Sequence, residues 1–401
     1  MTLSTTGSRA SDLDFQPALA DPAFHSDDPF PVFRRLREKP SLHRNETPGF
    51  WAVTRHEDVV AVSRDPSTFC SSQGTILQDL ERPIMPRQSI IYIDPPDHTK
   101  YRKLVQPAFT PGRLRALEGW IRKTTCDLLD AIEPGRPFDF VESFAAELPL
   151  VVIADMLGVP QADRPQFKIW SDHIIDAGSN PTEENLLHAA ALFQYFSGVL
   201  AERRAKPGDD LLSTLVQSDI DGERLEEFDL LSFCMTLLVA GNETTRNLLS
   251  HGVLALATHP DELAQLLGDR TLVPRAVEEM LRWGTPIAAF MRTATRDVVV
   301  RNTEVRAGDR LFMLYASANH DESVFGEDAG TFRISRDASG HVAFGFGEHF
   351  CLGAALARME GRIAFEELLA RFAKIELAGD VERLASLIVR GIVRLPVTLS
   401  A

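Results

Sequence analysis

A single cysteine in a glycine-rich loop is the residue best suited to do chemistry in this chain. Cys351 ends the run Phe-Gly-Phe-Gly-Glu-His-Phe-Cys that begins at Phe344, and an Ala/Leu-rich segment follows from Ala354. A cysteine at the start of a helix faces unpaired backbone N–H groups and the positive end of the helix dipole, and both lower the pKa of its thiol. We therefore expect an ionised sulfur that can ligate a metal, with Phe344 shielding it from water.

Three simpler interpretations of this loop compete with that one. Free cysteines are commonly buried and inert, so Cys351 alone would be an ordinary core residue. Gly345 and Gly347 begin like a dinucleotide-binding loop, but Phe350 stands where the third glycine belongs. A zinc site would need a second close Cys/His pair, which the sequence lacks. The glycines, Gly353 included, instead predict a backbone that approaches a large flat ligand.

The whole string from Phe344 to Gly353 resembles the haem-binding loop of the cytochrome P-450 family. The resemblance implies that Cys351 is the axial ligand of the haem iron, and that Phe344, Gly345 and Ala240 contact the haem. It also implies haem b (iron protoporphyrin IX) as cofactor, with O2 and NAD(P)H-derived electrons that arrive through a ferredoxin and its reductase.

A second motif lies on a helix predicted from about Glu226 to Thr258. Its centre reads Ala-Gly-Asn-Glu-Thr-Thr, and Gly241 together with the Thr244 hydroxyl is expected to loosen the helix there. Taken alone, the motif would also suit an ordinary buried helix with a polar end. It resembles the oxygen-activating motif of the family, which makes Glu243 and Thr244 the acid–alcohol pair that organises proton delivery.

A third motif is the predicted helix opened by Pro274 and closed by Gly284. Glu279 and Arg282 are three residues apart and share one helical face, where an exposed pair would be worth little. The motif resembles the ion-pair helix of the family, whose third member maps to Arg336. We assign these three residues to structure, because they would hold the haem loop rather than react.

Two more segments resemble the parts of the family that bind the haem propionates. His98 and Arg102 are four residues apart, so both can reach one carboxylate, although a solvated basic helix start would look the same. Arg292 follows the ion-pair helix at the corresponding place. With His349 from the cysteine loop, they make four donors for the two propionates.

Composition limits the class of protein. The chain has 401 residues and a formal net charge of −15, which argues against a nucleic-acid partner and an anionic membrane surface. Its four cysteines are far apart in the sequence, which indicates a reducing compartment, and we expect a cytoplasmic protein. The sequence predicts no signal peptide, membrane anchor or transmembrane segment. We also expect a monomer.

Periodicity predicts mostly helix with small β-sheets, and the resemblance implies the cytochrome P-450 fold. We expect a flexible tail over residues 1–12 and one domain over 13–401, since no linker or repeat interrupts the chain. Helical patterns dominate between Pro96 and His259. Strand character marks Phe50–Thr54, Asp297–Arg301, Val305–Leu314 and Ile388–Leu399, and a long loop is expected from Ser71 to Arg87.

The sequence thus predicts a haem-thiolate monooxygenase that inserts one oxygen atom of O2 into a C–H bond of an apolar small molecule, a steroid, terpenoid or lipid. A peroxide-driven peroxygenase and a haem-binding sensor without turnover remain alternatives, although neither would need Glu243 and Thr244. Arg82 or Arg87 would instead favour an acidic substrate. The expected pocket residues are mostly apolar: Ile76, Leu77, Ile90, Val239, Ala240, Ile287, Phe290 and Ile388.

Overall fold

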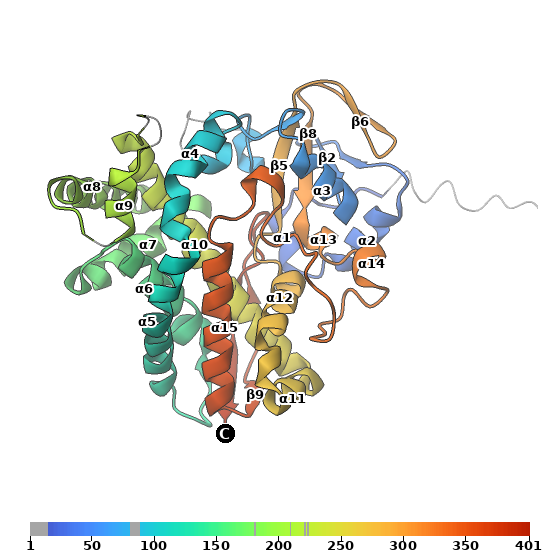
Figure 1. The fold of residues 1–401 in the computed structure, drawn as a ribbon. Coiled ribbons are helices and arrows are strands. Elements are labelled where there is room, and N and C mark those ends of the chain that lie inside the picture. Colours follow the sequence, from blue (N-terminus) through green and yellow to red (C-terminus); the bar gives the residue numbers. More distant parts are fainter. Residues whose placement is uncertain (1–14, 81–88, 180–181, 209, 220–221, 223) are drawn as a thin grey trace, which may run out of the picture.

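Helices form most of the molecule, and small sheets lie to one side of them (Figure 1). The computed structural model describes residues 15–80, 89–179, 182–208, 210–219, 222 and 224–401. The expected tail over residues 1–12, and Arg82 and Arg87, lie outside the described residues. The prediction of a mainly helical fold with small sheets is confirmed.

The helices are α1 (Pro22–Ser26), α2 (Phe30–Glu38), α3 (His56–Arg64), α4 (Asp97–Val105), α5 (Pro111–Asp130), α6 (Glu147–Met156), α7 (Arg164–Ser179), α8 (Glu183–Ala205), α9 (Leu211–Gln217), α10 (Glu227–Thr258), α11 (Pro260–Gly268), α12 (Val273–Gly284), α13 (Tyr315–Ala318), α14 (Glu322–Phe325) and α15 (Ala354–Arg371). The strands are β1 (His43–Asn45), β2 (Phe50–Val53), β3 (Phe69–Cys70), β4 (Phe138–Asp139), β5 (Ala289–Ala294), β6 (Val298–Val300), β7 (Thr303–Val305), β8 (Arg310–Leu314), β9 (Lys374–Leu377), β10 (Glu382–Arg383), β11 (Ile392–Arg394) and β12 (Pro396–Ser400).

The longest helix, α10, runs through the centre of the molecule. A capping box starts it, because Glu226 and Asp229 each accept a hydrogen bond from the other's backbone. The helix packs against α6, α7, α8, α12 and α15. Most residues toward each end of α10 are therefore buried. This packing holds the Glu243–Thr244 motif at the core of the fold.

Two glycines let the central helices approach one another. A Cβ at Gly252 of α10 would collide with the Phe365 ring of α15 and with the Met280 sulfur of α12. A Cβ at Gly361 of α15 would crowd Leu248 and Val277 in the same way. The close three-helix contact ties the helix that carries Thr244 to the helix that follows Cys351.

The largest sheet positions the remaining site residues. Its strand order in the described chain is β1-β2-β8-β5-β3, with β2 and β8 parallel and the other pairs antiparallel. Arg292 of β5 pairs with Leu311 of β8, so its backbone is fixed by the ladder. The predicted strand over Val305–Leu314 is instead two, because β7 ends at Val305 and a turn precedes β8.

Candidate active site

Cys351 lies in a short turn between the loop glycines and α15. Its backbone N–H donates to the Phe344 carbonyl (2.9 Å), which closes the loop, and the Gly353 N–H approaches its sulfur. Burial raises the pKa of the Cys351 thiol, while the Gly353 N–H, Arg102 and Arg358 oppose that effect. The expectation of a lowered pKa is therefore wrong for the chain alone. A thiolate in this place requires a bound cation, such as a metal ion.

Phe344 covers one side of this loop and carries a cation on its ring. The Arg358 guanidinium lies 4.5 Å from the ring centroid, and it donates two hydrogen bonds to Glu278 (2.6 and 2.9 Å). The same carboxylate lies 3.1 Å from His341. The sequence predicted neither Glu278 nor His341 here, and it assigned Arg358 to a docking surface, because these contacts join α12, the loop and α15 across about 80 residues.

The loop glycines serve different purposes. Gly345 and Gly347 both have positive φ, which few other residues adopt without strain. A Cβ at Gly347 would collide with the Ser63 carbonyl oxygen at the end of α3, so this glycine is needed for packing against α3. A Cβ at Gly353 would only touch the Cys351 sulfur at 4.0 Å. The prediction that all three make room for a flat ligand is therefore wrong for Gly347.

The structure brings the four predicted propionate donors together. His98 and Arg102 come from α4, Arg292 from β5 and His349 from the cysteine loop. The His98 and His349 rings lie 4.3 Å apart, and His349 Nε2 is 3.2 Å from the Ser71 hydroxyl. His98 is 1% exposed and Arg292 is 6% exposed. We call these four residues the basic cluster.

The basic cluster holds more positive charge than its surroundings compensate. Burial lowers the pKa of His349 to about 2, with help from Arg292, His98 and Arg102. Burial and the charge of Arg102 likewise lower the pKa of His98 to about 4, although Asp94 opposes this. Within the described chain, no carboxylate forms an ion pair with Arg102 or Arg292.

Carboxylates from a ligand fit this place. The buried Nε2 atom of His98 lacks a hydrogen-bond partner, and a buried polar atom without a partner is costly. Two arginines and two imidazoles can together donate to a pair of carboxylates. The basic cluster also faces Cys351, since the charges of Arg102 and the Cys351 sulfur act on each other. A thiolate ligand on one side and paired carboxylates at the rim match the donor set that a haem requires.

The middle of α10 is open although both of its ends are buried. Val239 is 38% exposed and Ala240 is also exposed, whereas Leu238 and Asn242 beside them are buried. A long helix that is otherwise mostly buried thus presents an uncovered apolar surface at its centre. A Cβ at Gly241 would collide with Ile153 of α6, so this glycine serves close packing. The helix is continuous through this stretch. Of the loosening expected at Gly241 and Thr244, the structure shows only one hydrogen bond from a side chain to the helix backbone.

That bond belongs to Thr244, whose hydroxyl donates to the Ala240 carbonyl (2.6 Å). The side chain of the neighbouring Glu243 forms its hydrogen bonds with other residues. Its carboxylate accepts from Asn247 Nδ2 (2.9 Å) and from Arg246 (3.4 Å), and it is 7% exposed. Asn247 in turn accepts from the Ile392 N–H (3.0 Å). The acid and the alcohol are thus adjacent in sequence but bonded separately, and sequence reasoning missed Asn247 as the residue that orients the acid.

Glu279, Arg282 and Arg336 meet in one buried network. Arg282 and Glu279 share two hydrogen bonds of 2.7 Å, and neither side chain is exposed. Arg336 donates to the same carboxylate at 3.3 Å. Arg282 also donates to the carbonyls of Asn319 and Ala329 (2.7 Å each). The network fixes the segment that leads into the cysteine loop.

Hydrogen bonds join the predicted pocket segments in pairs, and one of these bonds reaches α10. Backbone bonds of 2.6 Å join Met291 to Thr75 and Ala288 to Ile388. The Thr236 hydroxyl of α10 donates to Ser89, next to Ile90 (3.0 Å). Of the eight predicted residues, Leu77 is buried at 8% exposure, and seven are at least partly exposed: Ile76, Ile90, Val239, Ala240, Ile287, Phe290 and Ile388.

Comparisons with known proteins agree with this architecture. The family model for cytochrome P450 matches residues 180–398. The methyl-branched lipid omega-hydroxylase of Mycobacterium tuberculosis (strain ATCC 25618 / H37Rv) is 38% identical over 372 residues, which cover 88% of this chain and 86% of that protein. The vitamin D(3) 25-hydroxylase of Pseudonocardia autotrophica is 38% identical over 408 residues, 100% of this chain and 99% of that protein.

A solved structure is similar over nearly the same length. CYP109E1 from Bacillus megaterium, in complex with testosterone, superposes with a TM-score of 0.85 at 34% identity, covering 93% of this chain and 100% of that one. A half-buried cysteine before a helix that packs on the long α10, with two arginines and two imidazoles gathered nearby, is the arrangement expected of a haem-thiolate protein. The chain belongs to the cytochrome P450 family and is a monooxygenase that uses haem, O2 and reducing equivalents. Within the described chain, no helix is long and apolar enough to cross a membrane.

Proposed function

We propose that this monooxygenase hydroxylates a largely apolar molecule of steroid, terpenoid or branched-lipid size, with electrons from a ferredoxin. The exposed apolar centre of α10 is the observation that supports the substrate class most directly. Val239 and Ala240 are exposed there, and Ile287 and Ile388, which are partly exposed, come from two segments that a backbone hydrogen bond between Ala288 and Ile388 joins. Burying an apolar ligand against such surfaces gains about 25 cal/mol per Å². Two relatives are named as hydroxylases of a methyl-branched lipid and of vitamin D3, and CYP109E1 binds testosterone in its solved structure, which supports this class.

Five side chains would hold the haem. Cys351 would ligate the iron, and the basic cluster would bind the propionates through charge-assisted hydrogen bonds. When bound, the haem supplies an iron centre that binds and activates O2. Phe344 would exclude water from the sulfur, and the Gly353 N–H would hydrogen-bond it, which stabilises the thiolate. Glu279, Arg282 and Arg336 would keep the loop in place from outside the site.

Thr244 and Glu243 would manage protons. The Thr244 hydroxyl donates its hydrogen to the Ala240 carbonyl of its own helix, beside the exposed stretch, so its oxygen can accept a hydrogen bond from a water there and would donate to one only after rotating. Glu243 is held by Asn247 and Arg246 and would exchange protons by rotating away from them. A positioned acid and hydroxyl of this kind contribute about 100- to 10,000-fold to a proton-transfer step.

A positive surface near the basic cluster supports the choice of ferredoxin. Cations follow the haem-binding segments in the sequence, and four of them, Arg122, Lys123, Arg358 and Arg362, form ion pairs with carboxylates of this chain. Lys103, Arg113 and Arg115 are exposed at the end of α4 and the start of α5, and no ion pair engages them within the described chain. These three residues would attract an acidic iron–sulfur protein.

Spectral titration tests the substrate class. Steroids, terpenes, branched fatty acids and benzoates are titrated into the haem-loaded protein while the spin-state change of the haem is recorded. We expect micromolar responses to the apolar compounds, followed by product formation that requires reductant and O2. Responses to carboxylates alone, abolished by Arg87→Ala, would replace the apolar substrate with an acid. Product formed with hydrogen peroxide but not with reductant would establish the peroxygenase, and absence of any product would establish the sensor.

Charge reversal tests the electron donor. Lys103→Glu with Arg113→Glu should slow reduction by ferredoxin at least tenfold in low salt and leave reduction by dithionite unchanged. Salt should weaken the wild-type rate, because charges are screened within about 8–10 Å at physiological ionic strength. Arg34→Glu is the matched control, since Arg34 is 61% exposed on the distant helix α2. Equal rates in both variants, or a wild-type rate indifferent to salt, would exclude this docking surface.

A further inference from the structure

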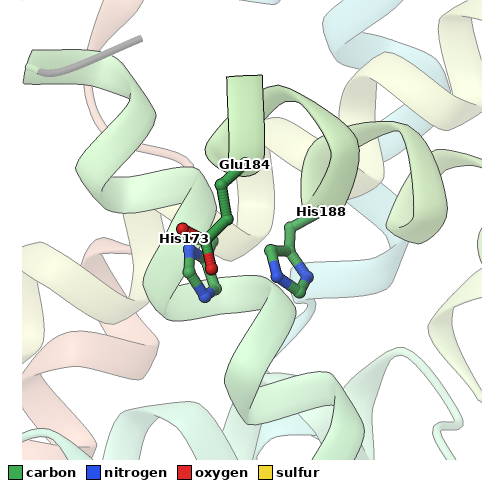
Figure 2. A group of neighbouring side chains, drawn as sticks. All are labelled: His173, Glu184 and His188. Carbon is green, nitrogen blue, oxygen red and sulfur yellow. The ribbon is translucent and has the colours of Figure 1, made fainter. Parts of the chain in front are cut away.

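Two histidines and a glutamate form a cluster between helices α7 and α8, outside the set of proposed haem ligands. His173 projects from α7, and Glu184 and His188 project from the first turns of α8 (Figure 2). One nitrogen or oxygen atom of each residue lies within 4.8 Å of the others. The two imidazole rings are stacked, with centroids 3.9 Å apart and planes 13° apart. Figure 2 shows the three side chains turned toward one another.

Asn185 already orients the imidazole of His173, one of the three residues of the cluster. His173 Nδ1 lies 2.8 Å from the Asn185 side-chain oxygen, and Asn185 is buried at 3% exposure. A hydrogen on Nδ1 then donates to that amide, which leaves the lone pair of Nε2 for a metal. Histidine ligands in metal sites are usually fixed through their second nitrogen in this manner. His188 and Glu184 are four residues apart, which puts both on the same face of α8.

We propose that His173, Glu184 and His188 bind a divalent transition-metal ion, with Zn²⁺ as the best match. Two imidazoles and one carboxylate are the donors that Zn²⁺ takes in open sites, with water in the fourth position. Tetrahedral ligand atoms at Zn²⁺ distances lie roughly 3.4 Å apart, so the site closes when the exposed Glu184 moves inward and the stacked imidazoles rotate to direct their in-plane lone pairs at one ion. A hard ion such as Mg²⁺ is disfavoured, because it prefers oxygen ligands.

The ion would link two helices that cover the centre of the molecule. Both α7 and α8 pack on each other and on α10. A metal bridging His173 to Glu184 and His188 would fasten α7 to the start of α8. Binding should therefore raise the melting temperature of the loaded protein in proportion to metal occupancy. Acid should weaken binding, because a proton competes for each imidazole.

Calorimetric titration of Zn²⁺ into tag-free, chelator-treated, haem-loaded protein tests the proposal. A Cys126→Ser background removes the half-exposed thiol as a competing ligand. We expect one equivalent of Zn²⁺ to bind, with at least tenfold weaker affinity in His173→Ala and in His188→Ala, and no response to Mg²⁺. Glu183→Ala is the matched control, because Glu183 is an exposed acid in the same turn but outside the cluster. The affinity of the Glu183→Ala variant for Zn²⁺ should equal that of the parent.

Two results would overturn the proposal. One is the absence of Zn²⁺ binding by the parent up to millimolar metal. The other is equal affinity in the parent and in the His173→Ala/His188→Ala double variant, which would assign the ion to another place. Unchanged circular dichroism and reduced carbon monoxide spectra in every variant show that the fold and the haem loop are intact.

Discussion

The Cys351 sulfur combines two opposing influences at the scale of a single residue. Burial disfavours its ionised form, whereas a nearby N–H and two arginines favour it. Without a metal, the first influence dominates, so the thiol should be less reactive than an exposed cysteine. An iron ion reverses this balance, because a thiol that coordinates a metal is deprotonated. The helix dipole, which the sequence emphasises, is the weaker influence here.

Replacing each cysteine with serine should separate their roles. Cys351→Ser should abolish the red-shifted band of the reduced carbon monoxide complex, because a hydroxyl does not replace the thiolate. Cys126→Ser, a matched change at a half-buried site, should retain the band. The spectrum of each purified variant decides the matter. A thiolate-type band in Cys351→Ser would disprove the ligand assignment.

Removal of one hydroxyl should uncouple electron use from product. Thr244→Ala leaves the haem residues intact but removes the proton donor next to the open centre of α10, so reducing equivalents should appear as hydrogen peroxide. We expect product per electron to fall by about 100- to 1000-fold. Thr244→Ser restores the hydroxyl and should recover most of the coupling. Oxygen, peroxide and product are measured together at saturating substrate, and unchanged coupling in Thr244→Ala would refute proton delivery by this residue.

The residue types at the site were predictable, but their orientations were not. The motif around Thr244 and the loop around Cys351 are local in sequence, so the sequence alone indicated them. The turn of Glu243 toward Asn247 depends on the Ile392 N–H, nearly 150 residues away. Likewise, the need for glycine at Gly347 comes from α3, which the loop sequence does not reveal.

At the scale of elements, Arg282 connects parts of the chain that have no regular structure of their own. From α12 it reaches Glu279 and the carbonyls of Asn319, Ala329 and Thr331. The Asn319 and Ala329 carbonyls belong to buried residues, and loss of this donor would cost about 1–3 kcal/mol each, whereas the Thr331 carbonyl also accepts from Arg336. The ion pair thus stabilises the approach to the haem loop through its hydrogen bonds more than through its charge.

Loss of one partner in this network should be costly. Glu279→Gln leaves the buried Arg282 charge without its carboxylate, and we expect the free energy of unfolding to fall by about 3–5 kcal/mol. Glu38→Gln breaks an exposed pair with Arg34, for which the side chains are 68% and 61% exposed, and should cost at most about 1 kcal/mol. Denaturant unfolding of the haem-loaded variants measures both. A loss for Glu279→Gln no larger than for Glu38→Gln would show that the network is dispensable.

Helix positions followed from periodicity, whereas helix contacts did not. The capped helix over Glu227–Thr258 agrees with its predicted bounds to within one residue. The crossing of α10, α12 and α15 depends on Gly252 and Gly361, which in sequence are merely weak helix formers. Only the packed structure shows that a methyl group at either position would strike a neighbouring helix.

At the scale of the whole molecule, buried histidines should make stability depend on pH. Burial, with nearby arginines, holds the pKa of His251 and of His320 well below the ordinary value of 6.5. The unfolded chain therefore binds more protons than the folded chain below about pH 6.5. The contribution of these neutral histidines to the free energy of unfolding is fully present above that pH. It is lost as pH falls, by up to about 1.4 kcal/mol per pH unit for each histidine.

Unfolding free energy measured between pH 5.5 and 7.5 should thus rise with pH. The slope is proportional to the number of protons that the unfolded chain binds in excess of the folded chain. His251→Asn should lower that number by about one, because asparagine does not titrate. The measurement uses urea, which leaves ionic strength constant. A slope that is flat in the parent, or unchanged in His251→Asn, would contradict neutral buried histidines.

The fold class was predictable from the whole sequence because helical periodicity covers most of it. The division of the predicted strand over Val305–Leu314 was not, since the break depends on a turn between β7 and β8. The net charge of the chain likewise did not predict which cations on the surface are unpaired. Carboxylates neutralise most of the arginines on α5 and α15, and only the paired structure shows which cations are left for a partner.

The basic cluster has a consequence for how the protein is made. A newly synthesised chain that folds here must place the like charges of Arg102 and Arg292 around His98 and His349, whose imidazoles are neutral there because burial and the two arginines repel a further proton. The repulsion between the two arginines opposes closure of this corner until two carboxylates enter it. Cofactor insertion is then a step of maturation rather than an addition to a finished protein, and the yield of correctly assembled molecules in a cell will follow its supply of haem.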